Sequence, residues 1–92
     1  MKLYWVERKA GQRLVLEDDD GDLKEMGAVR QTRRGFDAFA TTNTYDPGRA
    51  ERSIPSMEEA KTFVVSFRPW ELFIGPANLE VESEVRSAPS EE

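Results

Sequence analysis

Carboxylates are the most abundant reactive side chains of this chain, and one group of them is regularly spaced. Glu80, Glu82 and Glu84 alternate with apolar residues over 79–85, a period of two that is typical of a β-strand with one buried face. Side chains on one face of a strand lie about 6.5–7 Å apart, close to the spacing of phosphates along single-stranded DNA. The pattern predicts a row of exposed carboxylates that suits a basic partner.

Two other acidic regions of the chain extend this candidate surface. Four aspartates surround Gly21 in a predicted hairpin turn, and Glu71 lies shortly before the acidic segment. The aspartate turn lacks the bidentate glutamate that a calcium loop needs at its twelfth position, where Val29 stands, so no metal site is predicted. The predicted partner-binding residues are Glu71, Glu80, Glu82, Glu84, Asp18, Asp19, Asp20 and Asp22.

A second candidate surface lies in the middle of the chain, where arginines alternate with Phe36, Phe39 and Tyr45. Arginine with aromatic residues is typical of platforms that stack single-stranded nucleic acid, and equally of protein interfaces. A third interpretation is that these arginines only form surface ion pairs with neighbouring carboxylates. The residues of this alternative nucleic-acid or interface patch are Arg30, Arg33, Arg34, Arg49, Arg52 and Tyr45.

Catalysis is not predicted. The chain has no histidine to transfer protons near neutral pH and no cysteine nucleophile. Paired carboxylates can hydrolyse glycosides, but here we assign them to turns, a helix cap and an exposed strand face. The lack of cysteine also excludes disulfides and thiolate metal sites, and it suits a reducing cytoplasm. We expect a cytoplasmic, non-enzymatic protein that uses no cofactor.

The net charge of −5 is unevenly distributed along the chain. Residues 1–29 sum to −2, residues 30–56 to +2 and residues 57–92 to −5. An acidic C-terminal third disfavours broad nucleic-acid binding, which depends on cations that neutralise phosphates, and favours a basic partner. No run approaches the roughly 18 apolar residues of a membrane span, and no signal peptide is evident, so no membrane association is predicted.

The length of the chain suits one small domain, which we assign to residues 1–86, with 87–92 as a disordered acidic tail. Alternation and turn residues predict strands over 2–7, 12–17, 23–31, 36–44, 50–54, 70–74 and 79–85. Ser56 and Glu59 form a capping box, which predicts one helix that ends before Pro69. Trp5 and Trp70 are predicted core anchors. The predicted fold class is α+β: an antiparallel sheet of four to six strands with one helix packed across one face.

Residues 36–65 resemble the strand-strand-helix unit of integrase arm-binding and AP2-like domains. The resemblance rests mainly on Ile-Pro-Ser-x-x-Glu-Ala at 54–60, where the helix starts. It implies a sheet face that contacts DNA, for which Arg30, Arg33, Arg34 and Arg49 are the matching positions. As a short, acidic chain without cysteine, the whole sequence also resembles phage and mobile-element inhibitors of host defence, such as anti-CRISPR and anti-restriction proteins.

The second resemblance implies a function, which we take as the main prediction. The chain is expected to be a protein-interaction module that inhibits a host nucleic-acid-binding defence complex through its acidic surface, by occlusion or nucleic-acid mimicry. Its partner would then be a basic protein. The alternative is a small DNA- or RNA-binding accessory domain that uses an arginine-aromatic sheet face. A homo-oligomer paired through an exposed strand edge is a third interpretation.

Overall fold

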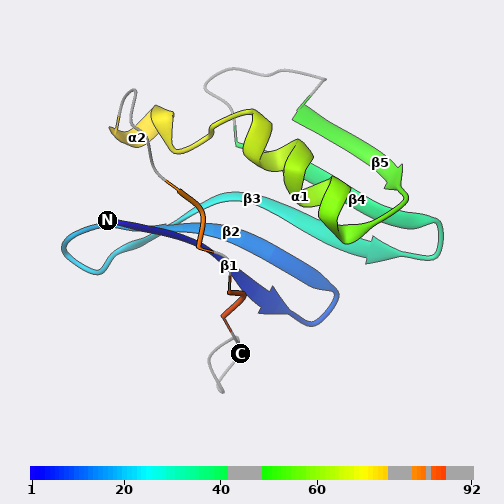
Figure 1. Ribbon diagram of the computed structural model, residues 1–92, viewed down its shortest axis with the longest axis horizontal. Coiled ribbons are helices and arrows are strands. Elements are labelled where there is room, and N and C mark those ends of the chain that lie inside the picture. The colour runs from blue at the N-terminus through cyan, green and yellow to red at the C-terminus, as the bar shows by residue number, and fades with distance from the viewer. Residues whose placement is uncertain (42–48, 75–79, 83, 87–92) are drawn as a thin grey trace.

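Five strands and two helices make up the computed structural model, which describes residues 1–41, 49–74, 80–82 and 84–86. The strands form one antiparallel sheet in chain order, with α1 lying across one face and the short α2 beyond it (Figure 1). This arrangement confirms the predicted α+β class. The elements are β1 (Lys2–Arg8), β2 (Gly11–Glu17), β3 (Leu23–Thr32), β4 (Gly35–Ala40), β5 (Ala50–Ile54), α1 (Met57–Ser66) and α2 (Glu71–Ile74).

Short turns connect the first four strands, and two of them depend on glycine. Gly21 and Gly35 have φ of 85° and 130°, a backbone region that side chains disfavour. The register of β2 and β3 shifts between Leu14 and Val15, so Met26 is an extra residue in β3, which is a β-bulge next to Gly27. A chain of hairpins places the turns β1–β2 and β3–β4 at one end of the sheet, and β2–β3 at the other.

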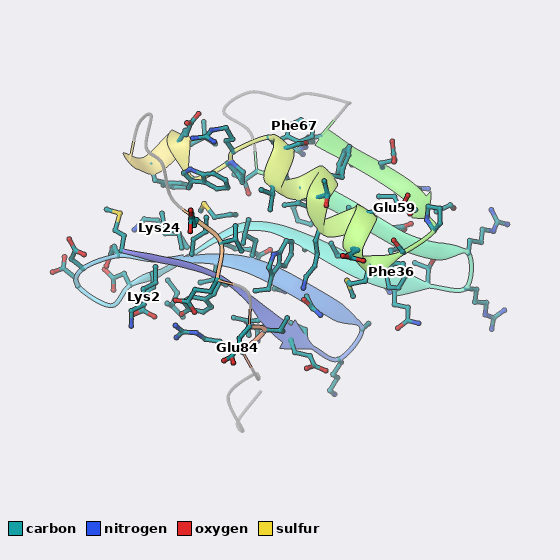
Figure 2. All side chains as sticks on the ribbon, viewed as in Figure 1. Lys2, Lys24, Phe36, Glu59, Phe67 and Glu84 are labelled. Atoms are coloured by element: carbon teal, nitrogen blue, oxygen red, sulfur yellow. The ribbon has the colours of Figure 1, made fainter. Side chains whose placement is uncertain are left out.

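The core lies between the sheet and α1, which packs against β3, β4 and β5. A Cβ atom on Gly27 would lie 2.5 Å from Val64 Cγ1 and 2.7 Å from Phe39 O, so the glycine allows the helix to lie close to the sheet. Phe36 and Phe67 lie near opposite ends of α1 (Figure 2). The main buried residues are Leu3, Trp5, Leu14, Leu16, Met26, Val29, Ala38, Ala40, Ile54, Ala60, Val64 and Trp70.

The predicted helix is confirmed as α1, and its start follows the capping signal. The Glu59 N–H donates to Ser56 Oγ at 3.1 Å, which satisfies one of the free donors of the first turn. The helix ends at Ser66, shortly before Arg68, whose φ is 49°, and Pro69. The capping box and Pro69 are therefore sufficient to predict where α1 starts and ends.

The predicted strand over 70–74 is wrong, because these residues form a turn and the short helix α2. The N–H groups of Glu71, Leu72 and Phe73 donate to carbonyls three residues earlier, at 3.0–3.2 Å, which is helical and not extended geometry. Trp70 is 2 % exposed, as expected of a core anchor. Trp70 is therefore buried, as predicted, but in a turn and not in a strand.

The predicted strand over 79–85 is also wrong. Residues 80–82 and 84–86, the C-terminal segment, form no regular strand, and they do not pair with 70–74 as a hairpin. The segment instead runs along the outer edge of β1 with one parallel bridge, between Val6 and Arg86. The bonds Glu82 N–H to Leu3 O, Arg86 N–H to Trp5 O and Glu7 N–H to Arg86 O are each 2.8 Å long. The segment thus covers an edge and adds no ladder.

Val81 and Val85 show why the period of two fails. Val81 packs against the core, as predicted, whereas Val85 is 38 % exposed. The predicted row of three glutamates on one strand face does not form, although Glu80, Glu82 and Glu84 are all exposed. The predicted tail over 87–92 and the end of the predicted strand over 36–44 lie outside the described residues.

Candidate functional site

The sheet face opposite α1, which we call the helix-free face, has no helix or strand packed on it in the part of the chain that the structure describes. Strand alternation and register decide which side chains lie there. On β3, β4 and β5 the register places Phe39 directly opposite both Ala28 and Ala50. One step further along, Arg30 is opposite Asp37.

Around Tyr4, the β1–β2 half of the helix-free face is closed by its own side chains. Tyr4, Val6 and Val15 form a second, smaller buried cluster. The Arg86 guanidinium lies 3.7 Å from the centre of the Tyr4 ring, and the Tyr4 hydroxyl donates to Glu17 at 2.7 Å. Burial, together with this hydrogen bond, raises the pKa of Tyr4. Intramolecular packing therefore occupies the part of this half that surrounds Tyr4.

The β3–β5 half of the helix-free face is open, and Phe39 lies at its centre. Its side chain is 40 % exposed, and the residues opposite it on both neighbouring strands are alanines. Because alanine has only a methyl group, the Phe39 ring is accessible across a shallow surface. We name Ala28, Arg30, Asp37, Phe39, Ala50 and Arg52 the arginine–Phe39 surface.

Two hollows share Ala28, Arg30 and Phe39 and extend from them in opposite directions. The hollow toward β2 has a volume of about 400 Å³ and includes Arg8, Lys9 and Arg13 in its lining. The hollow toward β5 has about 280 Å³ and includes Asp37, Glu51 and Arg52. Cationic side chains therefore lie on both sides of the exposed ring.

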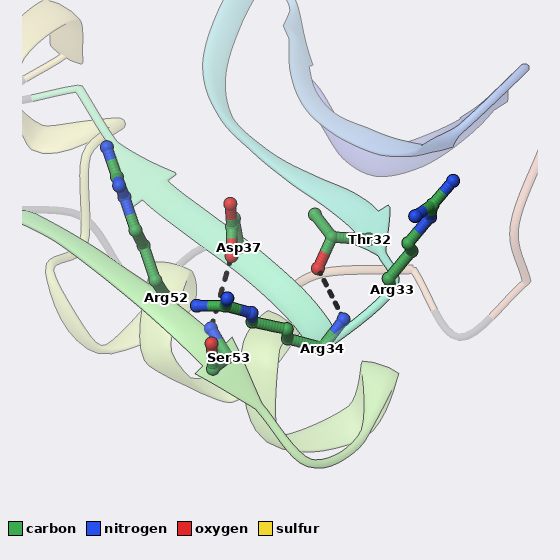
Figure 3. Close-up of a pocket in the computed structure, with 6 residues that line it drawn as sticks. All are labelled: Thr32, Arg33, Arg34, Asp37, Arg52 and Ser53. Carbon is green, nitrogen blue, oxygen red and sulfur yellow. Dashed lines mark hydrogen bonds between the residues drawn. The ribbon is translucent and has the colours of Figure 1, made fainter.

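A third hollow, of about 270 Å³, adjoins the arginine–Phe39 surface at the β3–β4 turn. It is lined by Thr32, Arg33, Arg34, Asp37, Arg52 and Ser53 (Figure 3). The Ser53 N–H donates to Asp37 Oδ1 at 3.1 Å, and the Arg34 N–H donates to Thr32 Oγ1 at 3.2 Å. Figure 3 shows Arg34 and Arg52 on two sides of Asp37, whereas Arg33 points away from the others.

The cations of the described chain differ in their pairing. Among the residues that the structure describes, Arg30, Arg33, Arg34 and Arg52 form no ion pair, although Asp37 is opposite Arg30. Lys2, Lys9 and Lys61 are in no ion pair there either. By contrast, cation–carboxylate pairs form between Arg13 and Glu25, Lys24 and Asp18, Arg68 and Glu71, Arg86 and Glu82, and the N-terminus and Asp19.

The predicted acidic surface is brought together in part. Asp19 accepts from the N-terminal ammonium at 2.9 Å, and the Glu82 N–H bonds to Leu3 O, so the aspartate turn and the start of the C-terminal segment both lie near the start of β1. Glu71 is the first residue of α2. Asp19, Glu71 and Glu82 are each in an ion pair, so much of this negative charge is compensated locally.

Asp18 has a structural role in its turn. Its Oδ1 accepts from the N–H groups of Asp20 and Asp22, both at 2.9 Å, and its Oδ2 accepts from Lys24 Nζ at 3.2 Å. The hydrogen bond from Asp22, with smaller contributions from Lys24 and Asp20, lowers the pKa of Asp18. No group of three acidic, histidine or cysteine side chains in the described ranges could hold a metal ion.

More residues of the predicted arginine patch than of the predicted acidic surface lie close together in the structure. Arg30, Arg33, Arg34 and Arg52 line adjoining hollows. Arg49 is half-buried before β5 and does not line these hollows, and Tyr45 is outside the described residues. Sequence reasoning missed Arg13, Ala28 and Ala50. Alternation alone indicates that the side chains of Arg13 and Leu14 point to opposite faces of the sheet. That Arg13 lines the same hollow as Phe39 depends on the register of three strands.

The fold and the surface together define a two-layer α+β domain with an arginine-lined, open sheet face. No family model, curated protein or solved structure matches this chain. The two resemblances noted above therefore rest on the sequence pattern alone. None of the described helices is long and apolar enough to span a bilayer.

Proposed function

We propose that this chain is a non-enzymatic binding module that holds an anionic partner on its arginine–Phe39 surface. One observation carries the proposal: Arg30, Arg33, Arg34 and Arg52 adjoin one open surface and have no ion-pair partner in the described part of the chain. An arginine that is already paired must give up its carboxylate before it can bind a ligand. These arginines would not pay that cost.

The chemistry of the side chain favours an oxyanion as the ligand. The guanidinium group presents five N–H donors in a planar fork that matches carboxylate and phosphate oxygens. Several such groups around a shallow face provide attraction that adds up along an extended anion, and that weakens with salt. The net charge of −5 is unevenly distributed, and residues 30–56, which include Arg30, Arg33, Arg34 and Arg52, sum to +2.

The arginines can be tested with inorganic polyphosphate as a simple anionic probe. We expect the double variant Arg30→Gln, Arg52→Gln to bind fluorescently labelled polyphosphate about tenfold more weakly at low ionic strength, because two charge-assisted contacts are lost. Fluorescence polarisation measures the dissociation constant, and the salt slope should also become shallower.

A charge-matched control is the double variant Lys2→Gln, Arg68→Gln, which removes two cations outside the hollows and should bind like the wild type. Equal weakening by the two double variants would show that only the net charge matters. Absence of binding to the wild type, or full binding by the Arg30 and Arg52 variant, would contradict the proposal.

A second candidate function is the inhibition of a host nucleic-acid-binding defence complex by the acidic surface, with a phage or mobile element as the source of the chain and a cytoplasmic location. The observation that favours it is the position of the aspartate turn and of Glu82 near the start of β1. The double variant Asp20→Lys, Glu80→Lys reverses charge there. If this function is correct, a basic complex captured from bacterial extract by the wild type will be lost by the variant.

A further inference from the structure

We infer that the anionic partner is a single strand of nucleic acid, with a base stacked on Phe39 and the backbone phosphates held by the surrounding arginines. This inference rests on the proposed function and names its ligand class. A polyanion without rings would use only the arginines. The central position of an exposed aromatic ring among them favours a ligand with flat apolar parts.

Phe39 is placed as a stacking residue would be. Its side chain is 40 % exposed in the middle strand of the open half, and alanines lie opposite it on β3 and β5. A planar base can therefore approach the ring without displacing a long side chain. Every base has a π-face, so stacking on an aromatic side chain suits a strand of any sequence.

The cations around Phe39 lie on both sides of it, as a continuous strand requires. Lys9 lines the hollow toward β2, and Arg52 lines the hollow toward β5. Neighbouring strands lie about 4.8 Å apart, so the distance from β2 to β5 is about 14 Å, enough for a short stretch of nucleotides. The path crosses the strands and passes over the ring.

Asp37 gives a second argument for nucleic acid. Its carboxylate lies opposite Arg30 and lines the same hollows as Arg52, where it would repel a ligand that carries only negative charge. A base edge carries N–H donors together with acceptors, so it can donate to Asp37 and accept from the arginines. A mixed site of this kind fits a base and its phosphate better than it fits polyphosphate.

A single strand fits this surface better than a duplex does. In a double helix each base is stacked between its neighbours and presents only its edge, so no base face is available to Phe39. The arginine–Phe39 surface is also shallow, and it has no helix that could enter a groove.

The experiment compares three labelled ligands of equal length: a mixed-sequence single-stranded DNA, the same backbone with abasic sites, and the matching duplex. Fluorescence polarisation of the full chain should show the base-containing single strand binding about tenfold more tightly than the abasic strand. Phe39→Ala should reduce its affinity to the abasic level, and Phe39→Tyr should retain it. Phe73→Ala is the matched control, because Phe73 is an exposed phenylalanine (47 %) away from this surface, on α2.

The possible results separate this inference from the proposed function. Equal binding of the abasic and the base-containing strands would overturn the inference and leave anion binding intact, and so would tighter binding of the duplex. Failure of all three ligands and of polyphosphate to bind would overturn both. The comparison of base-containing with abasic strands uses the wild-type protein, so the test does not depend on whether a Phe39 variant folds.

Discussion

Asp18 illustrates, at the scale of single residues, how an apparent functional group can be structural. The four aspartates of the β2–β3 turn read as a binding patch in the sequence. In the structure, Asp18 accepts two backbone N–H groups and Lys24 Nζ, which is the behaviour of a residue that organises a turn. Its carboxylate is occupied by its own loop, so we do not assign it to a partner.

The lowered pKa of Asp18 has a consequence for stability. A carboxyl group with a lower pKa in the folded state stabilises the fold above its unfolded pKa, and this contribution is lost as the pH falls through the folded pKa. We expect Asp18→Asn to be less stable than the wild type at neutral pH. This difference in stability should shrink as the pH falls below 3.8, the ordinary pKa of an aspartate.

Urea unfolding of both proteins at neutral and at acidic pH measures this difference. Asn keeps one side-chain oxygen that can accept from the turn N–H groups, so the variant loses the charge together with the contact to Lys24 Nζ. Asp20→Asn serves as the control, because it removes a charge from the same turn but leaves the hydrogen bonds of the Asp18 carboxylate in place. A difference between wild type and Asp18→Asn that does not depend on pH would contradict the assignment.

At the scale of the elements, the sequence predicts well wherever the signal is local. Ser56 and Glu59 determine the start of α1, and the glycines at 21 and 35 determine two hairpins, because each acts within three or four residues. The errors occur where a distant contact decides. Trp70 lies in the core just before α2, and residues 80–82 and 84–86 follow the edge of β1 without forming a ladder.

The same division applies to the candidate site. The arginines are visible in the sequence, but their lack of ion pairs is not, because pairing depends on which carboxylates the register brings near. Arg13 is one example: it pairs with Glu25 from β3, while Arg30 has Asp37 opposite and forms no ion pair with it in the described structure. Such differences depend on side-chain directions that one sequence does not specify.

The C-terminal segment makes a testable contribution to the edge of β1. The Glu7 N–H donates to Arg86 O, so removal of residues 80–92 should expose this amide to solvent. We expect its hydrogen exchange to become much faster than in the full chain, while amides in the centre of β3 keep their protection. Exchange followed by NMR measures both. Unchanged protection of Glu7 in the shortened chain would contradict this arrangement.

At the scale of the whole molecule, the two outer edges of the sheet are protected in different ways. The β1 edge is covered by the C-terminal segment. The β5 edge has no strand beside it among the described residues, but it carries Glu51 and Arg52, and Ser53 has a φ of 59°. Charges and an irregular backbone both disfavour pairing with another chain. We therefore assign partner binding to the open face and not to either edge.

The covered edge of β1 also bears on the order in which the chain can fold during synthesis. β1 is made first, and the residues that satisfy its outer N–H and C=O groups are the last described residues to leave the ribosome. Until then, the first strand has a partner on one side only. Completion of this domain is therefore a late event, and a stalled or truncated chain would present an unpaired strand edge to the quality-control machinery of the cell.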